Sequence, residues 1–143
     1  MKHSLERFGP PDIQLAGLSL WVHNGQGPPP DVQPYEDWLR ATAVCEADGA
    51  RVTTSGEILM WSDLSRLLDS AQRMYDRLEG SAELSTVEPY LSVSMRTEKT
   101  GRVVVAVEIT PDHLTQAHRF EFDIDQSYLP PFLLQLRSVL HRT

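Results

Sequence analysis

Apolar and polar residues alternate along several short stretches of this chain, with the two-residue period of a half-buried β-strand. Valines, leucines and phenylalanines stand at every second position in the clearest of them. The pattern predicts six strands, at residues 13–22, 37–45, 51–60, 90–96, 102–109 and 119–125. Gly17 interrupts the first of these strands, where a bulge is expected.

Turn signals between the strands indicate how they pair. Asp48-Gly49 favours a two-residue hairpin, because this pair readily adopts the positive φ of a type I′ turn. Residues 97–101 form a polar turn that ends in glycine. Pro111-Asp112 ends the strand expected over residues 102–109. The last three strands are therefore expected to form an antiparallel meander with one solvated face.

Two other stretches repeat apolar residues with the 3.6-residue period of an amphipathic helix. The first covers residues 62–79, with Ser62 as the expected N-cap and Gly80 as the left-handed residue after its end. The second covers residues 130–141, and it begins with prolines, which the first turn of a helix tolerates. The whole pattern predicts an α+β fold, in which two helices, the second C-terminal, pack on an antiparallel sheet of about six strands.

The chain length of 143 residues corresponds to one domain, and no repeat or linker divides it. We therefore expect a single domain over residues 1–143, with residues 1–11 as a flexible N-terminal segment. Residues 24–30 read Asn-Gly-Gln-Gly-Pro-Pro-Pro, which sustains neither helix nor sheet. This segment is expected to be a surface loop and is the best candidate for a mobile one.

The formal net charge is −7, from 20 acidic and 13 basic residues. Such a surface repels phosphate backbones, so direct nucleic-acid binding is not expected, whereas a basic protein partner would be attracted. The alternative is that the charge only keeps the protein soluble. No apolar run is long enough for a signal peptide or a membrane span, which predicts a cytoplasmic protein without membrane association.

Motifs of established catalysis are missing from the sequence, which has no phosphate-binding glycine loop and no Gly-x-Ser-x-Gly elbow. The five histidines lack metal-ligand spacing, and Cys45, the single cysteine, is expected to be a buried, inert thiol. Asp123 and Asp125 share a strand face and could serve acid–base chemistry or hold a cation, but a solvated strand face explains them equally. We predict no catalytic residue, no metal site and no cofactor.

Aromatic residues flank the Gly/Pro loop on both sides. Trp21 and His23 precede it, and Tyr35 and Trp38 follow it. Tryptophan and tyrosine are frequent anchors of protein interfaces, because they bury a large area for few lost rotors. They are also common at the rim of a core. These four residues are the candidate partner-binding residues, with rim packing as the alternative.

Five short motifs occur in a fixed order along the chain. They are Asp37-Trp38-Leu39, Gly56-Glu57, Gly80-Ser81-Ala82-Glu83-Leu84, Glu88-Pro89-Tyr90-Leu91 and Asp125-Gln126-Ser127-Tyr128-Leu129-Pro130. Together they resemble the WapI family of bacterial immunity proteins, over residues 15 to 140 or so. The last motif is the most distinctive, and the prolines at 28–30 lie outside the family pattern.

The resemblance implies a small cytosolic protein that binds and blocks the toxic C-terminal domain of a contact-delivered polymorphic toxin. Such domains are often basic nucleases, which an acidic inhibitor complements. The family motifs are expected to encode the fold rather than partner contacts. Two alternatives remain open: a small-ligand-binding or regulatory module with an apolar pocket between helix and sheet, and an enzyme in which Asp123 works with Asp125 or His118.

Overall fold

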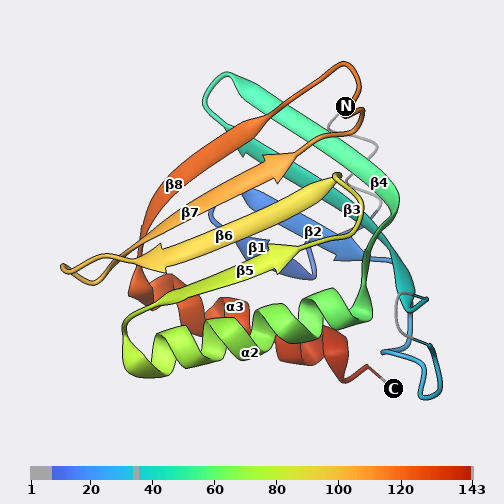
Figure 1. Ribbon diagram of the computed structural model, residues 1–143, viewed down its shortest axis with the longest axis horizontal. Coiled ribbons are helices and arrows are strands. Elements are labelled where there is room, and N and C mark those ends of the chain that lie inside the picture. Colours follow the sequence, from blue (N-terminus) through green and yellow to red (C-terminus); the bar gives the residue numbers. More distant parts are fainter. Residues whose placement is uncertain (1–7, 34–35, 143) are drawn as a thin grey trace.

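The structure is a computed structural model that describes residues 8–33 and 36–142, which form two four-stranded antiparallel sheets and two α-helices (Figure 1). Sheet A consists, in spatial order, of β1 (Ile13–Leu15), β2 (Leu18–Val22), β3 (Trp38–Ala47) and β4 (Ala50–Met60). Sheet B consists of β5 (Ser81–Ser85), β6 (Leu91–Thr97), β7 (Arg102–Ile109) and β8 (Arg119–Asp125). The helices are α2 (Trp61–Arg77) and α3 (Leu129–Leu140), and a 3₁₀ turn, η1 (Gln126–Tyr128), leads into α3.

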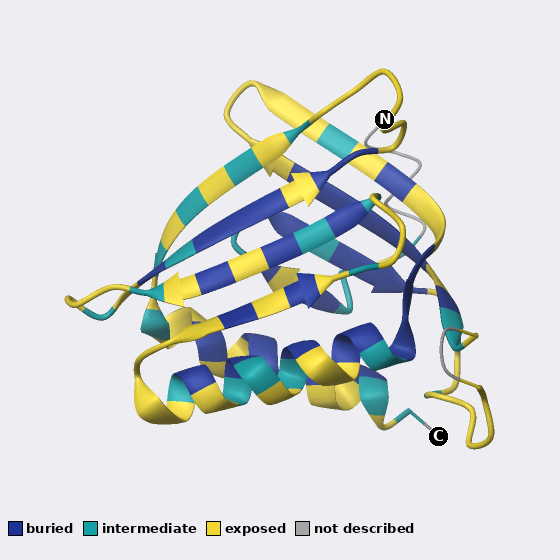
Figure 2. Cartoon of the chain, viewed as in Figure 1, coloured by how far each residue is buried: buried dark blue, intermediate teal, exposed yellow. Residues whose placement is uncertain are grey.

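The two sheets lie face to face, and both helices close the space between them along one side (Figure 1). α2 packs along β5, α3 packs on β1, and the two helices contact each other. Buried side chains from both sheets and both helices make one apolar core. Along the strands of sheet B, buried positions alternate with more exposed ones, as Figure 2 shows. The outer face of sheet B is therefore largely open to solvent.

The α+β class and the C-terminal position of the second helix are confirmed, but the strands number eight, in two sheets, rather than about six in one. The strand expected over residues 13–22 is two strands, because Ala16 takes a positive φ of 52° and turns the chain back with Gly17. This is a tight turn and not a bulge. β5 was missed because it is short and has only two buried apolar side chains, Ala82 and Leu84.

The hairpin at Asp48-Gly49 and the C-terminal meander are confirmed. Gly49 has a φ of 83°, and Ala47 pairs with Ala50 across the two-residue turn. β6, β7 and β8 pair consecutively and antiparallel, in a register without interruption.

The expected ends of the first helix are wrong by one or two residues. Its N-cap is Met60 rather than Ser62, which lies inside the first turn. At the other end, the left-handed residue that caps the helix is Leu78, with a φ of 54°, and Gly80 follows with a φ of 104°. The start of this helix does not follow the local sequence rule, because contacts with Asp37, outside the helix, bind its first N–H groups.

Gly17 joins the β1–β2 turn to the rest of the fold. Its carbonyl accepts a hydrogen bond of 3.0 Å from the Glu46 backbone N–H. A Cβ atom at this position would lie 2.2 Å from the Glu46 carbonyl oxygen and 2.6 Å from Cζ of Phe122. Only glycine therefore lets this turn approach both β3 and β8.

We expect Gly17→Ala to lower the free energy of unfolding by about 1–3 kcal/mol, because the added methyl group overlaps backbone and a packed ring. Gly25→Ala is the matched control, since nothing lies within 4 Å of a Cβ there and its φ is not positive. Urea unfolding of both variants measures the difference. Equal stabilities would show that the turn can move away from Phe122 at little cost.

Candidate functional site

Three of the four candidate residues lie at one end of sheet A, and the fourth, Tyr35, lies outside the described residues. Trp21 is near the end of β2, His23 follows it, and Trp38 begins β3. β2 and β3 are antiparallel, so the end of one strand meets the start of the other. The His23 backbone N–H donates to the Arg40 carbonyl over 2.9 Å, which fixes this junction.

Trp21 packs beneath the described part of the N-terminal segment. Its side chain is buried, and its indole Nε1 donates a hydrogen bond of 3.0 Å to the Gly9 carbonyl. The Phe8 ring lies 6.1 Å from the Trp21 ring and 4.7 Å from the His23 imidazole, between centroids. Trp21 therefore supports the site from behind rather than facing solvent.

His23 belongs to a chain of side-chain hydrogen bonds on the outer side of sheet A. Its Nε2 lies 2.8 Å from the Thr42 hydroxyl, which lies 2.7 Å from the Ser55 hydroxyl. Thr42 is buried, at 3% exposure, so no substrate reaches the central hydroxyl. The chain of bonds holds the imidazole in place across three neighbouring strands and has no accessible nucleophile at its centre.

A cleft of about 810 Å³ opens between the Gly/Pro loop and the ends of β2 and β3. His23 and Trp38 line it together with three residues that sequence reasoning missed, namely Arg40, Trp61 and Arg142. Trp38 is half-buried and Arg40 is exposed. A half-buried indole beside the exposed guanidinium group of Arg40 can hold a planar or carboxylate side chain of another protein.

The loop wall of this cleft is tied to the C-terminal end of the chain. Arg142 donates from Nη1 to the Val22 and Asn24 carbonyls over 2.9 and 2.7 Å, and its Nη2 lies 2.8 Å from Asp12 Oδ1. The Gly27 N–H in turn donates to the Arg142 carbonyl over 3.1 Å. These bonds give part of the loop a defined place against α3.

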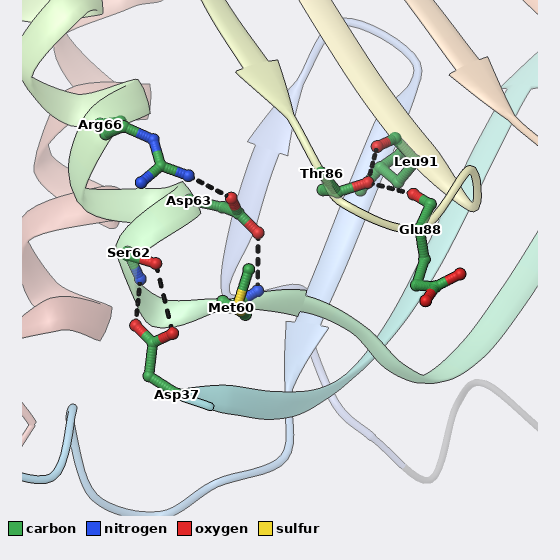
Figure 3. Close-up of polar contacts among 8 residues, drawn as sticks. All are labelled: Asp37, Met60, Ser62, Asp63, Arg66, Thr86, Glu88 and Leu91. Carbon is green, nitrogen blue, oxygen red and sulfur yellow. Dashed lines mark hydrogen bonds and ion pairs between the residues drawn. The ribbon is translucent and has the colours of Figure 1, made fainter. Parts of the chain in front are cut away.

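Asp37, immediately before Trp38, caps the start of α2 from outside the helix (Figure 3). Its Oδ2 accepts a hydrogen bond of 2.8 Å from the Ser62 N–H, and its carbonyl accepts one of 2.9 Å from the Trp61 N–H. These N–H groups lack partners inside the helix, and the helix dipole favours a carboxylate beside them. Asp37 thus positions Trp38 and Trp61 on the same cleft.

Asp63 completes the helix start and is almost fully buried, at 2% exposure. Its carboxylate accepts 2.8 Å and 2.6 Å hydrogen bonds from the Met60 N–H and from Arg66 Nη2 (Figure 3). Burial raises the pKa of Asp63, although the Met60 N–H and the Arg66 charge oppose the rise. A raised folded-state pKa means that this group stabilises the fold at low pH and that its contribution is lost as the pH rises through that pKa.

The other family motifs also hold the chain together locally. The Thr86 hydroxyl donates to the carbonyls of Glu88 and Leu91, which shapes the entry into β6 (Figure 3). Asp125 caps η1, since its Oδ2 accepts from the Ser127 N–H over 3.3 Å. The turn that leads into the last helix is therefore capped by a carboxylate at the end of β8.

The residues considered for catalysis are each engaged elsewhere. Asp123 pairs with Arg102 Nε at 3.0 Å, Asp125 bonds Ser127, and His118 Nε2 lies 3.0 Å from Gln116. The structure therefore does not join these three groups into one reactive cluster. In residues 8–33 and 36–142, no group of three His, Cys, Asp or Glu side chains is arranged to hold a metal ion, and no helix is long and apolar enough to cross a membrane.

Cys45 is confirmed as a buried thiol. It lies on the inner face of β3 at 0% exposure, and burial, helped by the nearby Glu46 charge, raises its pKa to about 12. Because the thiolate is the reactive form of cysteine, the folded protein holds this group unreactive at neutral pH.

We expect Asp37→Ala to lower the free energy of unfolding by about 1–2 kcal/mol, the usual cost of losing a helix N-cap. Asp69 is an exposed acidic residue on α2 and serves as the control. The free energy of unfolding of Asp69→Ala should stay within about 0.5 kcal/mol of that of the parent. Urea unfolding followed by circular dichroism measures both. If the two variants were equally stable, water would replace the Asp37 carboxylate without loss.

We further expect Cys45 to react with a thiol reagent such as dithionitrobenzoate only after unfolding. At pH 8 the folded protein should label far more slowly than the same protein in guanidinium chloride, because the thiol is both buried and protonated. Rapid labelling of the folded protein would mean that β3 opens locally on the time scale of the assay.

Comparison with known proteins agrees with the motifs. The family model of the WapI-like immunity proteins matches residues 11–143, nearly the whole chain. No curated protein matches the sequence. The match includes the segments that hold the cap of α2, the entry into β6 and the cap of η1, so the resemblance seen in the sequence is confirmed. The chain belongs to the WapI-like immunity protein family.

Proposed function

We propose that this protein is a non-enzymatic inhibitor that binds and neutralises the toxic C-terminal domain of a polymorphic toxin in the cytoplasm. Membership of an immunity protein family over nearly the whole chain carries the proposal. The favoured target is a basic nuclease domain, since a net charge of −7 attracts a basic protein and repels nucleic acid. The inhibitor acts by occluding the toxin and needs no cofactor.

The cleft beside the Gly/Pro loop is the first contact surface that we propose. Trp38 offers a half-buried indole there, His23 is held in place by Thr42, and Arg40 is exposed at the rim. Tyr35, between the loop and Trp38 in sequence, is proposed as a further contact, and Trp21 as an indirect one through His23. Aromatic residues in such clefts contribute strongly to protein interfaces.

A small-ligand-binding or regulatory module is the second candidate function. The size of the cleft favours it, because 810 Å³ lies within the range of roughly 300–1,000 Å³ typical of ligand sites. The Gly/Pro loop, residues 24–30, supplies most of the lining of this cleft, however, whereas the sequence places the pocket of such a module between helix and sheet. The inhibitor therefore remains the leading proposal.

The test is a pull-down with tagged protein from lysate of the native host, washed at low and then high salt, followed by mass spectrometry. We expect a basic toxin domain that is retained at low salt and released at high salt. Trp38→Ala should weaken its retention by tenfold or so, as expected for an aromatic interface anchor. Leu114→Ala, which removes an exposed apolar side chain from a distant loop, is the matched control and should retain the toxin fully.

Recovery of no protein partner at low salt would count against the inhibitor. Recovery of the same partner by wild type and Trp38→Ala would leave the function standing but exclude the cleft as its main contact. Circular dichroism of the variant shows whether its fold is intact.

A further inference from the structure

β8 has one backbone edge without a partner strand in the described structure. It is the last strand of sheet B, and β7 pairs with its other side. Hydrogen bonds from the Ile109 N–H to the His118 carbonyl and from the Gln126 N–H to the Gly101 carbonyl bracket the β7–β8 ladder. In an antiparallel pair such bonded positions alternate. The backbone groups of Phe120, Phe122 and Ile124 therefore point to β7, and those of Arg119, Glu121 and Asp123 point to the open edge.

The two faces of β8 differ sharply at this edge. Side chains on the outer face are exposed, and three of the four, Glu121, Asp123 and Asp125, are acidic. Side chains on the inner face are apolar but only half-buried, because the core does not extend beyond this last strand. The rings of Phe120 and Phe122 stack with centroids 6.4 Å apart. A strand added here would meet carboxylates on one face and apolar surface on the other.

A groove of about 520 Å³ lies at the same edge, where β8 leads into α3. Phe122 and Ile124 of β8 line it with Tyr128 of η1 and Pro131 of α3, and residues 14–16 of β1 and its turn line it as well. Tyr128 is 61% exposed beside this groove, whose lining combines apolar side chains with those of Gln14, Asp123 and Gln135. An apolar side chain that pointed inward from an added strand would fill this groove.

The other sheet edges lack this combination. α3 covers β1, where the Gln135 side chain accepts from the Gln14 N–H over 2.8 Å, and α2 packs along β5. β4 is open, but Glu57 is the one acidic residue along it, and Gly56, with a φ of 127°, lies where its register with β3 shifts. An interrupted strand is a poor template for pairing.

We propose that the open edge of β8 is the docking site for an extended segment of a partner protein in which basic and apolar residues alternate. The segment adds a strand to sheet B, with its basic side chains against Glu121, Asp123 and Asp125 and its apolar ones against the inner face and the groove. Backbone hydrogen bonds give such docking affinity, and alternate side chains give it specificity. The identification of the partner as a toxin domain rests on the proposed function. The alternation of basic and apolar residues in the docked segment is inferred from the edge itself.

Arg102 limits where the new ladder forms. Its Nη2 donates to the Asp123 carbonyl over 3.3 Å, and its Nε pairs with the same residue's carboxylate. This outward carbonyl is therefore already engaged. The added strand forms its bonds with Arg119, Glu121 and the N–H of Asp123, at the end of β8 away from η1.

The test uses a synthetic peptide of alternating lysine and valine, long enough to span β8, with blocked ends. The control peptide has the same composition arranged as paired lysines and paired valines, so that it cannot separate charge and apolar surface onto two faces. Amide hydrogen exchange of the labelled full chain is followed by NMR. We expect the alternating peptide to slow exchange of the Glu121 and Asp123 amides, and to leave those of Thr53 and Ser55 on β4 unchanged.

Two substitutions separate the backbone bond from the charge. Glu121→Pro removes an N–H that points to solvent, which an edge strand tolerates, and should weaken peptide binding by about fivefold or more. Glu121→Gln keeps the N–H and should weaken binding only about twofold, with a smaller salt dependence. Thr53→Pro makes the same backbone change on β4 and should leave binding unaltered.

Equal binding of the two peptides, or protection of β4 instead of β8, would overturn the proposal. The exchange experiment on the wild-type chain decides this even where Glu121→Pro fails to fold. If, in the lysate experiment, the folded Glu121→Pro variant captured a basic partner as well as wild type does, the β8 edge would be excluded as the docking site. The inhibitor function would still stand. If the alternating peptide bound at β8 but no toxin domain was recovered from the lysate, the docking site would stand and the inhibitor function would not.

Discussion

The apolar core between the two sheets has to be closed at its sides, and the two helices close only one of them. α2 packs along β5 and α3 on β1, so one lateral edge of each sheet is covered. The opposite edges, β4 and β8, keep unpaired backbone groups at the surface of the described structure. Proteins usually blunt such edges. Here β4 is interrupted by a bulge at Gly56, whereas β8 is regular and is protected only by its charged outward side chains, three of the four acidic.

The covered side depends on one carboxylate that reaches across the fold. Asp37 binds the first N–H groups of α2, although it lies 25 residues earlier in sequence. The bond fixes the helix to the start of β3, and thereby places Trp38 and Trp61 on the cleft. Asp63 binds the Met60 N–H from inside the helix. The two carboxylates thus anchor the same turn from opposite sides.

Sequence reasoning found most elements because alternation and helical periodicity are local properties of the chain. It identified the meander from β6 to β8 and the Asp48-Gly49 hairpin, where one face is buried or one turn type is required. It missed β5, whose two apolar residues form too short a pattern, and the turn at Ala16, which needs a positive φ that alanine rarely adopts. It also assigned the cap of α2 to Ser62, because a cap supplied by Asp37 from another strand leaves no local signal.

The cleft beside the Gly/Pro loop and the open edge of β8 could be predicted only in part for the same reason. The aromatic residues around the loop stood out in the sequence, but Arg40 and Arg142, which share their cleft, become neighbours only through the β2–β3 pairing and the end of α3. For β8, alternation gave the two faces correctly. Strand order, which makes β8 an edge, is not encoded in the period of any one segment.

Most of the proposed docking residues lie outside the family motifs, and Trp38, Asp125 and Tyr128 belong to both sets. Asp37, Glu88 and Asp125 take part in hydrogen bonds that shape a helix start, a strand entry and a 3₁₀ turn. Loop 24–30 and the outward residues Glu121 and Asp123 lie outside those motifs. In the inhibitor proposed above, docking residues outside the motifs, such as Glu121, can change without loss of a structural hydrogen bond of the motifs. On an edge strand this freedom is greatest, since backbone bonds supply affinity whatever side chains are present, and the side chains alone determine which partner fits.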